Sequence, residues 1–217
     1  AGRAVLSDSW WSHGWLRSYV ESAAPALDRL PALMKHPLIQ RLFPDRTADQ
    51  VGQVWARRNM LLDYLDRAPQ TFCHLDANRR NLFLRVDTAG RQELRLVDWA
   101  FAGSAPIGQE LTALVVGSVV LYAMEPADLA QLERAALAGY AEGLEAAGCT
   151  YDRRHIRAIF AVAAALRYNA YILVRMPVLL DERRREWAER VLGHSLENFI
   201  DRCVEVRHYL LNLAAEA

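Results

Sequence analysis

The chain has 217 residues, of which 53% are hydrophobic, and it carries 26 acidic and 26 basic residues. This composition excludes a mainly disordered chain, and the length suits one large domain or two small ones. Because the net charge is zero, no basic excess is present for nucleic acid or an anionic membrane, and we expect neither as a partner. The single lysine is Lys35, so almost all of the basic residues are arginines.

The three cysteines are widely spaced and form no C-x-x-C pair: Cys73, Cys149 and Cys203. Their number and spacing argue against a disulfide framework or a structural zinc site and favour a reducing compartment. No signal segment opens the chain, and the longest nearly apolar run, residues 111–124, is too short to span a bilayer. We therefore expect a cytoplasmic protein, and no feature indicates its oligomeric state.

Residues 1–70 are predicted to be helical. Ser7 and Asp8 can cap a first helix, and three prolines then predict an interrupted segment: Pro25, Pro31 and Pro37. Residues 47–50 have the spacing of a capping box and open a second helix, which ends at Pro69.

Residues 71–110 have a different pattern. A short strand is predicted at 71–74, and a β-hairpin is predicted from the apolar runs at 82–86 and 93–97. A loop of small residues follows at 102–106.

Helices are predicted again over residues 111–217, which we interpret as the substrate-side part of one domain. Gly193 and His194 interrupt the last of these helices and predict a bend. The expected fold class is thus mainly α with one small hairpin. The predicted helices cover residues 107–124, 126–148, 152–175 and 181–217.

Three polar residues carry the predicted chemistry. Asp76 and Asn81 flank a short loop, and the hairpin returns Asp98 close to Asn81. An aspartate and an asparagine that converge in this way offer oxygen ligands for Mg²⁺, and Asp76 is placed to orient a hydroxyl and accept its proton. Phosphoryl transfer needs both of these parts.

The pattern His74-x-Asp76-x-x-x-x-Asn81, followed by an apolar strand and Asp98, resembles the catalytic loop and metal-binding strand of the kinase-like fold. With Trp99 directly after Asp98, it is closer to the aminoglycoside phosphotransferase and choline kinase-like superfamily. The resemblance implies that Asp76 is the catalytic base, that Asn81 and Asp98 bind the Mg²⁺ ions that bridge the phosphates of ATP, and that His74 supports the loop.

Two further features are left open by the resemblance. The superfamily has a glycine and then an aspartate that opens a helix, which correspond to Gly103 and Glu110 here, so Glu110 departs from the pattern and its role is undecided. Arg79 and Arg80 either contact phosphate or form a solvated loop face.

The acceptor is expected to be a hydroxyl of a small molecule, because only residues 99–106 separate Asp98 from the next predicted helix, and a protein kinase needs a longer segment there to hold a peptide. Aminoglycosides, amino sugars and related alcohols all remain candidates. A polar set within an apolar helix either lines the substrate pocket or forms the polar edge of a core helix: Arg167, Tyr168, Asn169 and Tyr171.

The phosphate-gripping lysine of a kinase N-terminal lobe has no counterpart in the chain. Lys35 lies between prolines rather than on a strand, and no glycine-rich loop precedes it. We therefore expect the C-terminal lobe alone, with little turnover by these residues in isolation. The alternative hypothesis is a non-catalytic binding or scaffold protein that retains a kinase-like C-terminal lobe.

Overall fold

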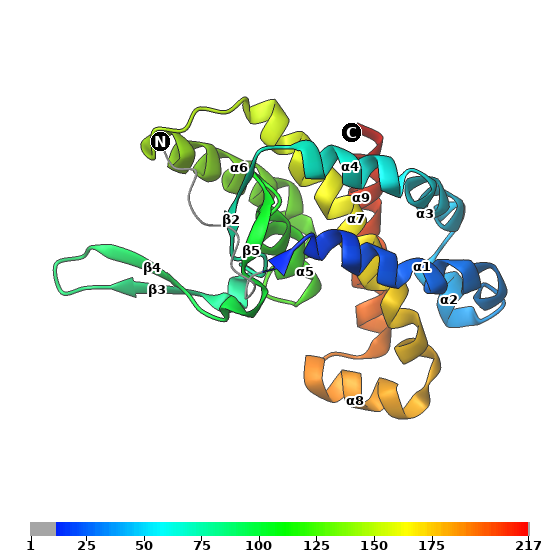
Figure 1. Ribbon diagram of the computed structural model, residues 1–217. Coiled ribbons are helices and arrows are strands. Elements are labelled where there is room, and N and C mark those ends of the chain that lie inside the picture. Colours follow the sequence, from blue (N-terminus) through cyan, green and yellow to red (C-terminus); the bar gives the residue numbers. More distant parts are fainter. Residues whose placement is uncertain (1–11, 217) are drawn as a thin grey trace.

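The computed structural model describes residues 12–216, so the Ser7 and Asp8 cap predicted for the first helix lies outside the described residues. The described part of the chain is mainly helical, with one three-stranded sheet and one two-stranded hairpin (Figure 1).

Four helices precede the sheet: α1 (Trp15–Leu33), α2 (Pro37–Leu42), α3 (Thr47–Ala56) and α4 (Arg58–Arg67). The predicted interruption at Pro25 and Pro31 is wrong, because both lie within α1. Both prolines are on the exposed side of the helix, where water can bond to the carbonyl groups that lose their helical partner. The interruption comes only before Pro37, which occupies the first turn of α2.

The capping box predicted at residues 47–50 is also wrong. Arg46 is the N-cap of α3, while Thr47 is already helical and buried, so its hydroxyl does not cap the helix. The helix predicted to reach Pro69 is divided at Arg57 into α3 and α4.

A small sheet joins three distant segments in the order β1 (Ser12–His13), β5 (Gly103–Pro106) and β2 (Gln70–Cys73). The strand predicted at 71–74 is confirmed with a shift of one residue. The loop predicted at 102–106 is wrong, since its small residues form the central strand β5. A Cβ atom on Gly103 would collide with the carbonyl oxygen of Ser12, so the small residue permits the pairing with β1.

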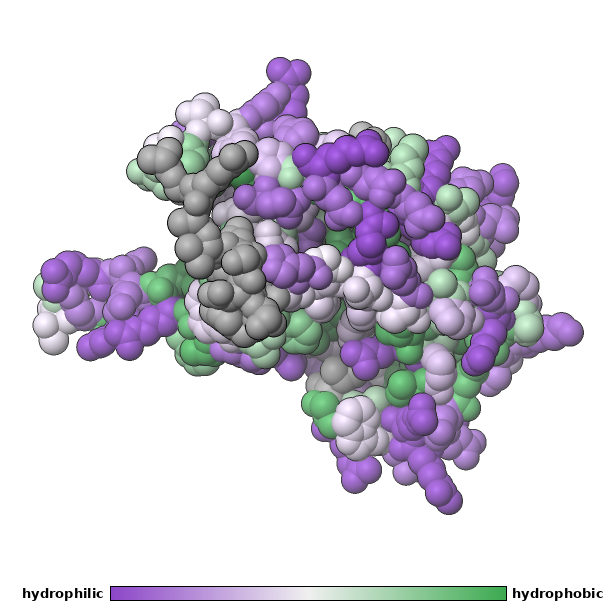
Figure 2. Space-filling model, viewed as in Figure 1, coloured by the Kyte–Doolittle hydropathy of each residue, from purple (hydrophilic) through white to green (hydrophobic). Residues whose placement is uncertain are grey.

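The predicted hairpin is confirmed, and it projects away from the helical body in Figure 1. It consists of β3 (Leu82–Val86) and β4 (Gln92–Leu96), which pair antiparallel with Leu82 opposite Leu96. In Figure 2 the far part of the hairpin is hydrophilic and apolar surface appears nearer its base.

The remaining chain forms a π-helical segment, Ala113–Gly117, and the helices α5 (Ser118–Val120), α6 (Leu129–Ala146), α7 (Arg153–Leu180), α8 (Glu182–Leu192) and α9 (Leu196–Glu216). The continuous helix predicted at 107–124 is wrong, because turns and the π-helical segment replace much of it. The helix predicted to end before Pro177 continues through this exposed residue. The bend predicted at Gly193 is confirmed, since this residue adopts a left-handed conformation that ends α8.

The long helix α7 forms the centre of the core and packs mainly against α9 and α1 (Figure 1). By length and composition it is the one described helix that could cross a membrane, but 78% of its most apolar window is buried inside the protein. That burial is typical of the core helix of a folded domain. The loop predicted to be catalytic, residues 74–81, contacts this helix, since Arg167 donates a hydrogen bond to the Leu75 carbonyl oxygen. The core therefore determines where the predicted site residues are held.

Candidate active site

His74 connects the catalytic loop to the strand that precedes Asp98. The ring is buried, its Nδ1 accepts a hydrogen bond from the backbone N–H of Asp76 at 3.3 Å, and its Nε2 lies 2.9 Å from the carbonyl oxygen of Val97. Because a carbonyl only accepts, Nε2 donates in its bond to Val97, while Nδ1 accepts from Asp76, so the two bonds define how the ring is oriented. Both nitrogens are therefore occupied by structural hydrogen bonds.

Glu110, whose role the sequence left undecided, supports the same loop. Its Oε1 accepts a hydrogen bond from the backbone N–H of His74 at 2.9 Å. Burial and the neighbouring Glu110 carboxylate raise the pKa of the Cys73 thiol above its ordinary value, which argues against Cys73 as a nucleophile. Glu110 thus holds the start of the catalytic loop.

Asp76 lies at the turn of this loop. The residue before it, Leu75, has a left-handed backbone conformation with φ 63°. The Asn81 amide nitrogen donates to the backbone oxygen of Asp76 at 2.9 Å and to its Oδ2 at 3.0 Å. Asn78 also donates to the Asp76 backbone oxygen through its side chain, at 3.1 Å. These bonds fix the orientation of one carboxylate oxygen and leave the carboxylate partly exposed, at 25%.

The other carboxylate oxygen of Asp76 faces Arg167, which comes from α7. Arg167 Nη2 lies 3.6 Å from Asp76 Oδ1, while its Nη1 donates to the Leu75 carbonyl oxygen at 2.8 Å and to Thr112 Oγ1 at 3.3 Å. The guanidinium also stacks over the Trp15 ring at 4.7 Å. Arg167 therefore links the core helix to both the backbone and the side chain of the predicted catalytic residue.

Asp98 lies where the hairpin returns to the loop. The Val97 N–H donates to the Asn81 carbonyl oxygen at 3.1 Å, so the hairpin brings Asp98 next to Asn81 as the sequence predicts. Asp98 has a left-handed backbone with φ 63° and is exposed, and its carboxylate has no hydrogen bond or ion pair to the described residues. A non-glycine residue in this conformation carries strain that is common at functional sites.

The donor set of Asn81 and Asp98 fits Mg²⁺. The Asn81 nitrogen is committed to Asp76, which leaves its amide oxygen available, and Asp98 adds an unpaired carboxylate. Mg²⁺ commonly takes one or two protein ligands and completes its octahedron with phosphate oxygens and water. Within residues 12–216 no three His, Cys, Asp or Glu side chains converge on one point, so the fit depends on this pair.

Arg79 and Arg80 are both exposed. The Arg79 backbone N–H donates to Ser118 Oγ at 2.9 Å, and its guanidinium donates to the Leu82 carbonyl oxygen at 3.0 Å. Arg79 therefore anchors the loop to α5 and to the base of the hairpin.

A cavity of about 300 Å³ opens beside Asp76, between α1, α5 and α7. Its walls are largely aromatic, and its charged lining residues are Asp76, Arg167 and Arg175. Burial raises the pKa of Tyr168 to about 12, so this wall residue is a neutral phenol at physiological pH. Of the polar set predicted on α7, the cavity is lined by Arg167, Tyr168 and Tyr171, while Asn169 is buried and bonds to Ala165 in its own helix.

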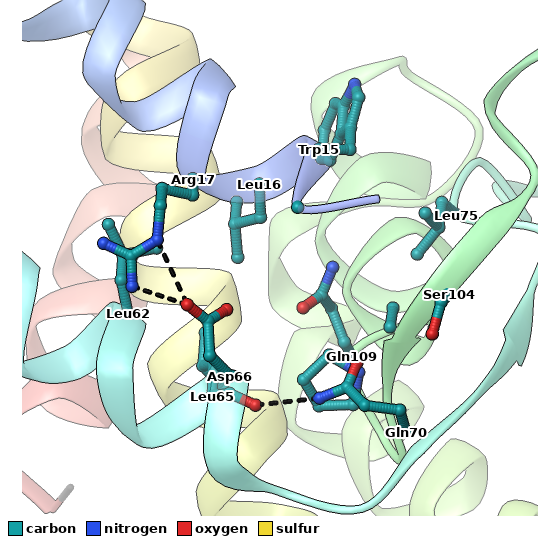
Figure 3. A pocket seen from close by; sticks show the side chains of 13 residues that line it. Trp15, Leu16, Arg17, Leu62, Leu65, Asp66, Gln70, Leu75, Ser104 and Gln109 are labelled. Carbon is teal, nitrogen blue, oxygen red and sulfur yellow. Dashed lines mark hydrogen bonds and ion pairs between the residues drawn. The ribbon is translucent and has the colours of Figure 1, made fainter. Parts of the chain in front are cut away.

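Figure 3 shows a much smaller pocket, whose lining includes Trp15, Leu75 and Gln109. Its volume of about 40 Å³ suits water rather than a substrate. The Arg17–Asp66 ion pair closes one side, and Gln70 donates to the Leu65 carbonyl oxygen on another (Figure 3). We therefore take the cavity beside Asp76 as the candidate active site.

The comparison with protein families agrees with this geometry. The family model of the phosphotransferase enzyme family (APH) matches residues 13–159, which is more than half of the chain. The chain belongs to this family. No curated protein and no solved structure matches it. Membership in the phosphotransferase enzyme family indicates a kinase-type enzyme and confirms the resemblance seen in the sequence.

The family match includes the catalytic loop and Asp98 but ends within α7, before Arg167 and Arg175. The loop residues are thus in the part of the chain that the phosphotransferase family shares, whereas these two arginines are outside it. Arg167 is the main site residue that the sequence motif does not identify. The signal available for it was a charged residue within a long apolar helix.

Proposed function

We propose that the chain carries the catalytic side of a small-molecule kinase, in which Asp76 positions the acceptor hydroxyl and accepts its proton. The hydroxyl oxygen forms a bond to the γ-phosphorus of ATP, the bond from that phosphorus to the β–γ bridging oxygen breaks, and ADP leaves with the electron pair. Asn81 and Asp98 would hold Mg²⁺, which neutralises phosphate charge when bound. His74 would act as a positioning residue, consistent with its hydrogen bonds to Asp76 and Val97.

The observation that carries the proposal is the position of Asp76 on the wall of the 300 Å³ cavity, with one carboxylate oxygen fixed by Asn81. A volume near 300 Å³ is at the lower end of the range for small-molecule sites. After Asp98 the chain makes one 3-10 turn, Trp99–Phe101, whose last residue lines the cavity, and it then enters β5. This short connection supports a small acceptor rather than a peptide.

We also propose that the described residues form the C-terminal lobe of the kinase-like fold and that a nucleotide-covering lobe packs on the hairpin side. The position of Lys35 supports this proposal. It lies in an exposed turn between α1 and α2, outside any strand, so it does not correspond to the strand-borne lysine of a kinase N-terminal lobe. Apolar side chains that are exposed on the hairpin offer a surface for such packing: Phe83, Leu84, Val86 and Leu94.

The test is Asp76→Asn, which keeps the size of the side chain but removes the base. With Mg-ATP and an alcohol acceptor, in the longest natural form of the protein, we expect kcat to fall by roughly 10²–10⁴-fold. The unfolding midpoint should stay close to that of the parent protein. Asp28→Asn, at an exposed position of α1, is the matched control and should leave turnover unchanged.

Near-normal turnover by Asp76→Asn would contradict the proposed base. If the parent protein binds ATP but transfers no phosphoryl group to any acceptor, the non-catalytic alternative replaces the kinase. Transfer to a peptide but not to a small alcohol would contradict the proposed acceptor class.

A further inference from the structure

The charges that line the cavity beside Asp76 are unusual for a site that binds cations. One carboxylate, Asp76, faces two guanidinium groups, Arg167 and Arg175, so the lining has a formal charge of +1. A polycationic acceptor would need several acidic partners in this space, and the described lining supplies one. Like charges brought together in a pocket disfavour a ligand and so contribute to specificity.

The two arginines differ in how many hydrogen-bond and ion-pair partners they have. Arg167 is 12% exposed and is occupied by the Leu75 carbonyl, Thr112 and Asp76. Arg175 is exposed, and it contacts the Tyr171 side chain, with its guanidinium 4.7 Å from the ring centroid and a hydrogen bond to the hydroxyl. It has no carboxylate partner among residues 12–216. Arg175 is therefore the cation of this cavity whose charge no described carboxylate neutralises.

The walls between the two charged positions are flat and aromatic. Trp15 and Tyr19 stack with ring centroids 5.2 Å apart, and Phe101 contacts Trp15 edge-on at 5.8 Å. Tyr168 and Tyr171 continue this surface on α7. Such walls favour a ring or another apolar body over a heavily hydrated sugar amine, because transfer of apolar surface from water is favourable.

Arg175 also lies between two neighbouring cavities and lines both of them. It lines the cavity beside Asp76 and a neighbouring, mainly apolar cavity of about 240 Å³ between α7, α8 and α9. Arg167 and Arg175 are eight residues apart on one helix, or about 12 Å along its axis. The two guanidinium groups thus extend from positions more than two turns apart on α7.

We propose that the acceptor is a hydroxy compound with an apolar, ring-containing body and an anionic group, and that Arg175 binds the anion. This inference rests on the proposed kinase function and specifies its acceptor. The hydroxyl lies at Asp76, the ring lies against the aromatic wall, and the carboxylate or phosphate pairs with Arg175. A polycationic aminoglycoside is a poor ligand of this site.

The test is a binding series on one scaffold, measured by calorimetry with the chain in the absence of ATP. The probes are 4′-(hydroxymethyl)biphenyl-4-carboxylate, the corresponding carboxamide, the corresponding aminomethyl compound, and the corresponding phosphate monoester; kanamycin is the polycationic probe. We expect the carboxylate to bind about 10-fold more tightly than the carboxamide, as a charge-assisted hydrogen bond provides. The aminomethyl compound and kanamycin should bind more weakly than the carboxamide. The ratio between the carboxylate and the phosphate tells which anion the site prefers.

Arg175→Gln should bring the carboxylate and carboxamide to equal affinity, and Arg175→Lys should restore part of the difference. Arg134→Gln, at an exposed position of α6, is the matched control and should keep the full preference. Tighter binding of kanamycin than of the carboxylate, or an unchanged preference in Arg175→Gln, would overturn the inference. Because binding is measured without phosphoryl transfer, a failure of the kinase proposal appears separately, as absent turnover with the anion preference intact.

Discussion

The two sides of the candidate active site differ in how completely this chain holds them. On the acceptor side, His74 is buried and Asp76 is fixed by Asn81 and Arg167. On the metal side, Asp98 and Trp99 are exposed, and the Asp98 carboxylate has no partner within residues 12–216. The loop is therefore organised by the fold of the chain, whereas the side of Asp98, where we propose that Mg-ATP binds, has no comparable support among the described residues.

The largest change should follow from removing the link between the two sides. In His74→Ala the Asp76 N–H and the Val97 carbonyl both lose their partner, and the buried ring leaves a space. We expect the free energy of unfolding to fall by about 3 kcal/mol, because buried polar groups without partners are costly. Urea unfolding measures this change.

His208→Ala is the matched control for His74→Ala, since His208 is exposed on α9. It should change the free energy of unfolding by no more than about 0.5 kcal/mol. Equal effects of the two substitutions would mean that His74 does not hold the loop.

A smaller loss is expected from Arg167→Met, which keeps a long side chain but removes the guanidinium. The Leu75 carbonyl and Thr112 hydroxyl lose their donor, and Asp76 loses its nearby cation. We expect the free energy of unfolding to fall by about 2 kcal/mol, and kcat to fall more than KM rises, because Asp76 loses its fixed position. Arg167→Lys retains the charge without the planar guanidinium, so a full recovery by lysine would show that the charge alone, and not the set of contacts to Leu75, Thr112 and Asp76, holds the site.

His74 and Arg167 illustrate which parts of the candidate site could be predicted from the sequence. His74, Asp76 and Asn81 lie within eight residues, so local spacing is enough to group them, and the hairpin then brings in Asp98. Arg167 contacts Leu75 from 92 residues away, through the packing of α7, and no local pattern specifies that contact. The mistaken elements have a similar cause, since tertiary pairing makes β5 from a run of small residues, which resembles a loop in isolation.

Asp98→Asn examines the metal side alone. Asparagine tolerates the left-handed conformation, and the Asp98 carboxylate supports nothing else in residues 12–216, so the free energy of unfolding should stay within about 0.5 kcal/mol. Mg²⁺-dependent ATP affinity should fall by at least about 100-fold, because a direct ligand matters no less than its supporting shell. Titration of ATP with and without Mg²⁺ measures this. If Asp98→Asn lowered the free energy of unfolding by as much as the free energy of ATP binding, Asp98 would support the fold as well as the proposed metal site.

The smallest expected effect is a dependence of stability on pH that comes from buried tyrosines on the acceptor side. Residues 77–110 contain no tyrosine. Tyr168 lines the cavity behind the loop, and the Tyr140 hydroxyl accepts a hydrogen bond from the Gly108 N–H at 3.2 Å. Burial raises the pKa of both phenols from 10.0 to about 12.

Because these pKa values are raised in the folded protein, the unfolded chain loses the phenolic protons first as the pH increases. The stabilisation that the neutral phenols provide is complete below about pH 10 and is lost progressively between about pH 10 and 12. Urea midpoints should therefore decline over that interval, and Tyr168→Phe should decline less steeply than the parent protein. Tyr64→Phe is the comparison variant, since burial also raises the pKa of Tyr64, which lies on α4 and does not line the cavity. An equal pH slope in Tyr168→Phe and the parent would show that burial behind the loop does not hold this phenol neutral.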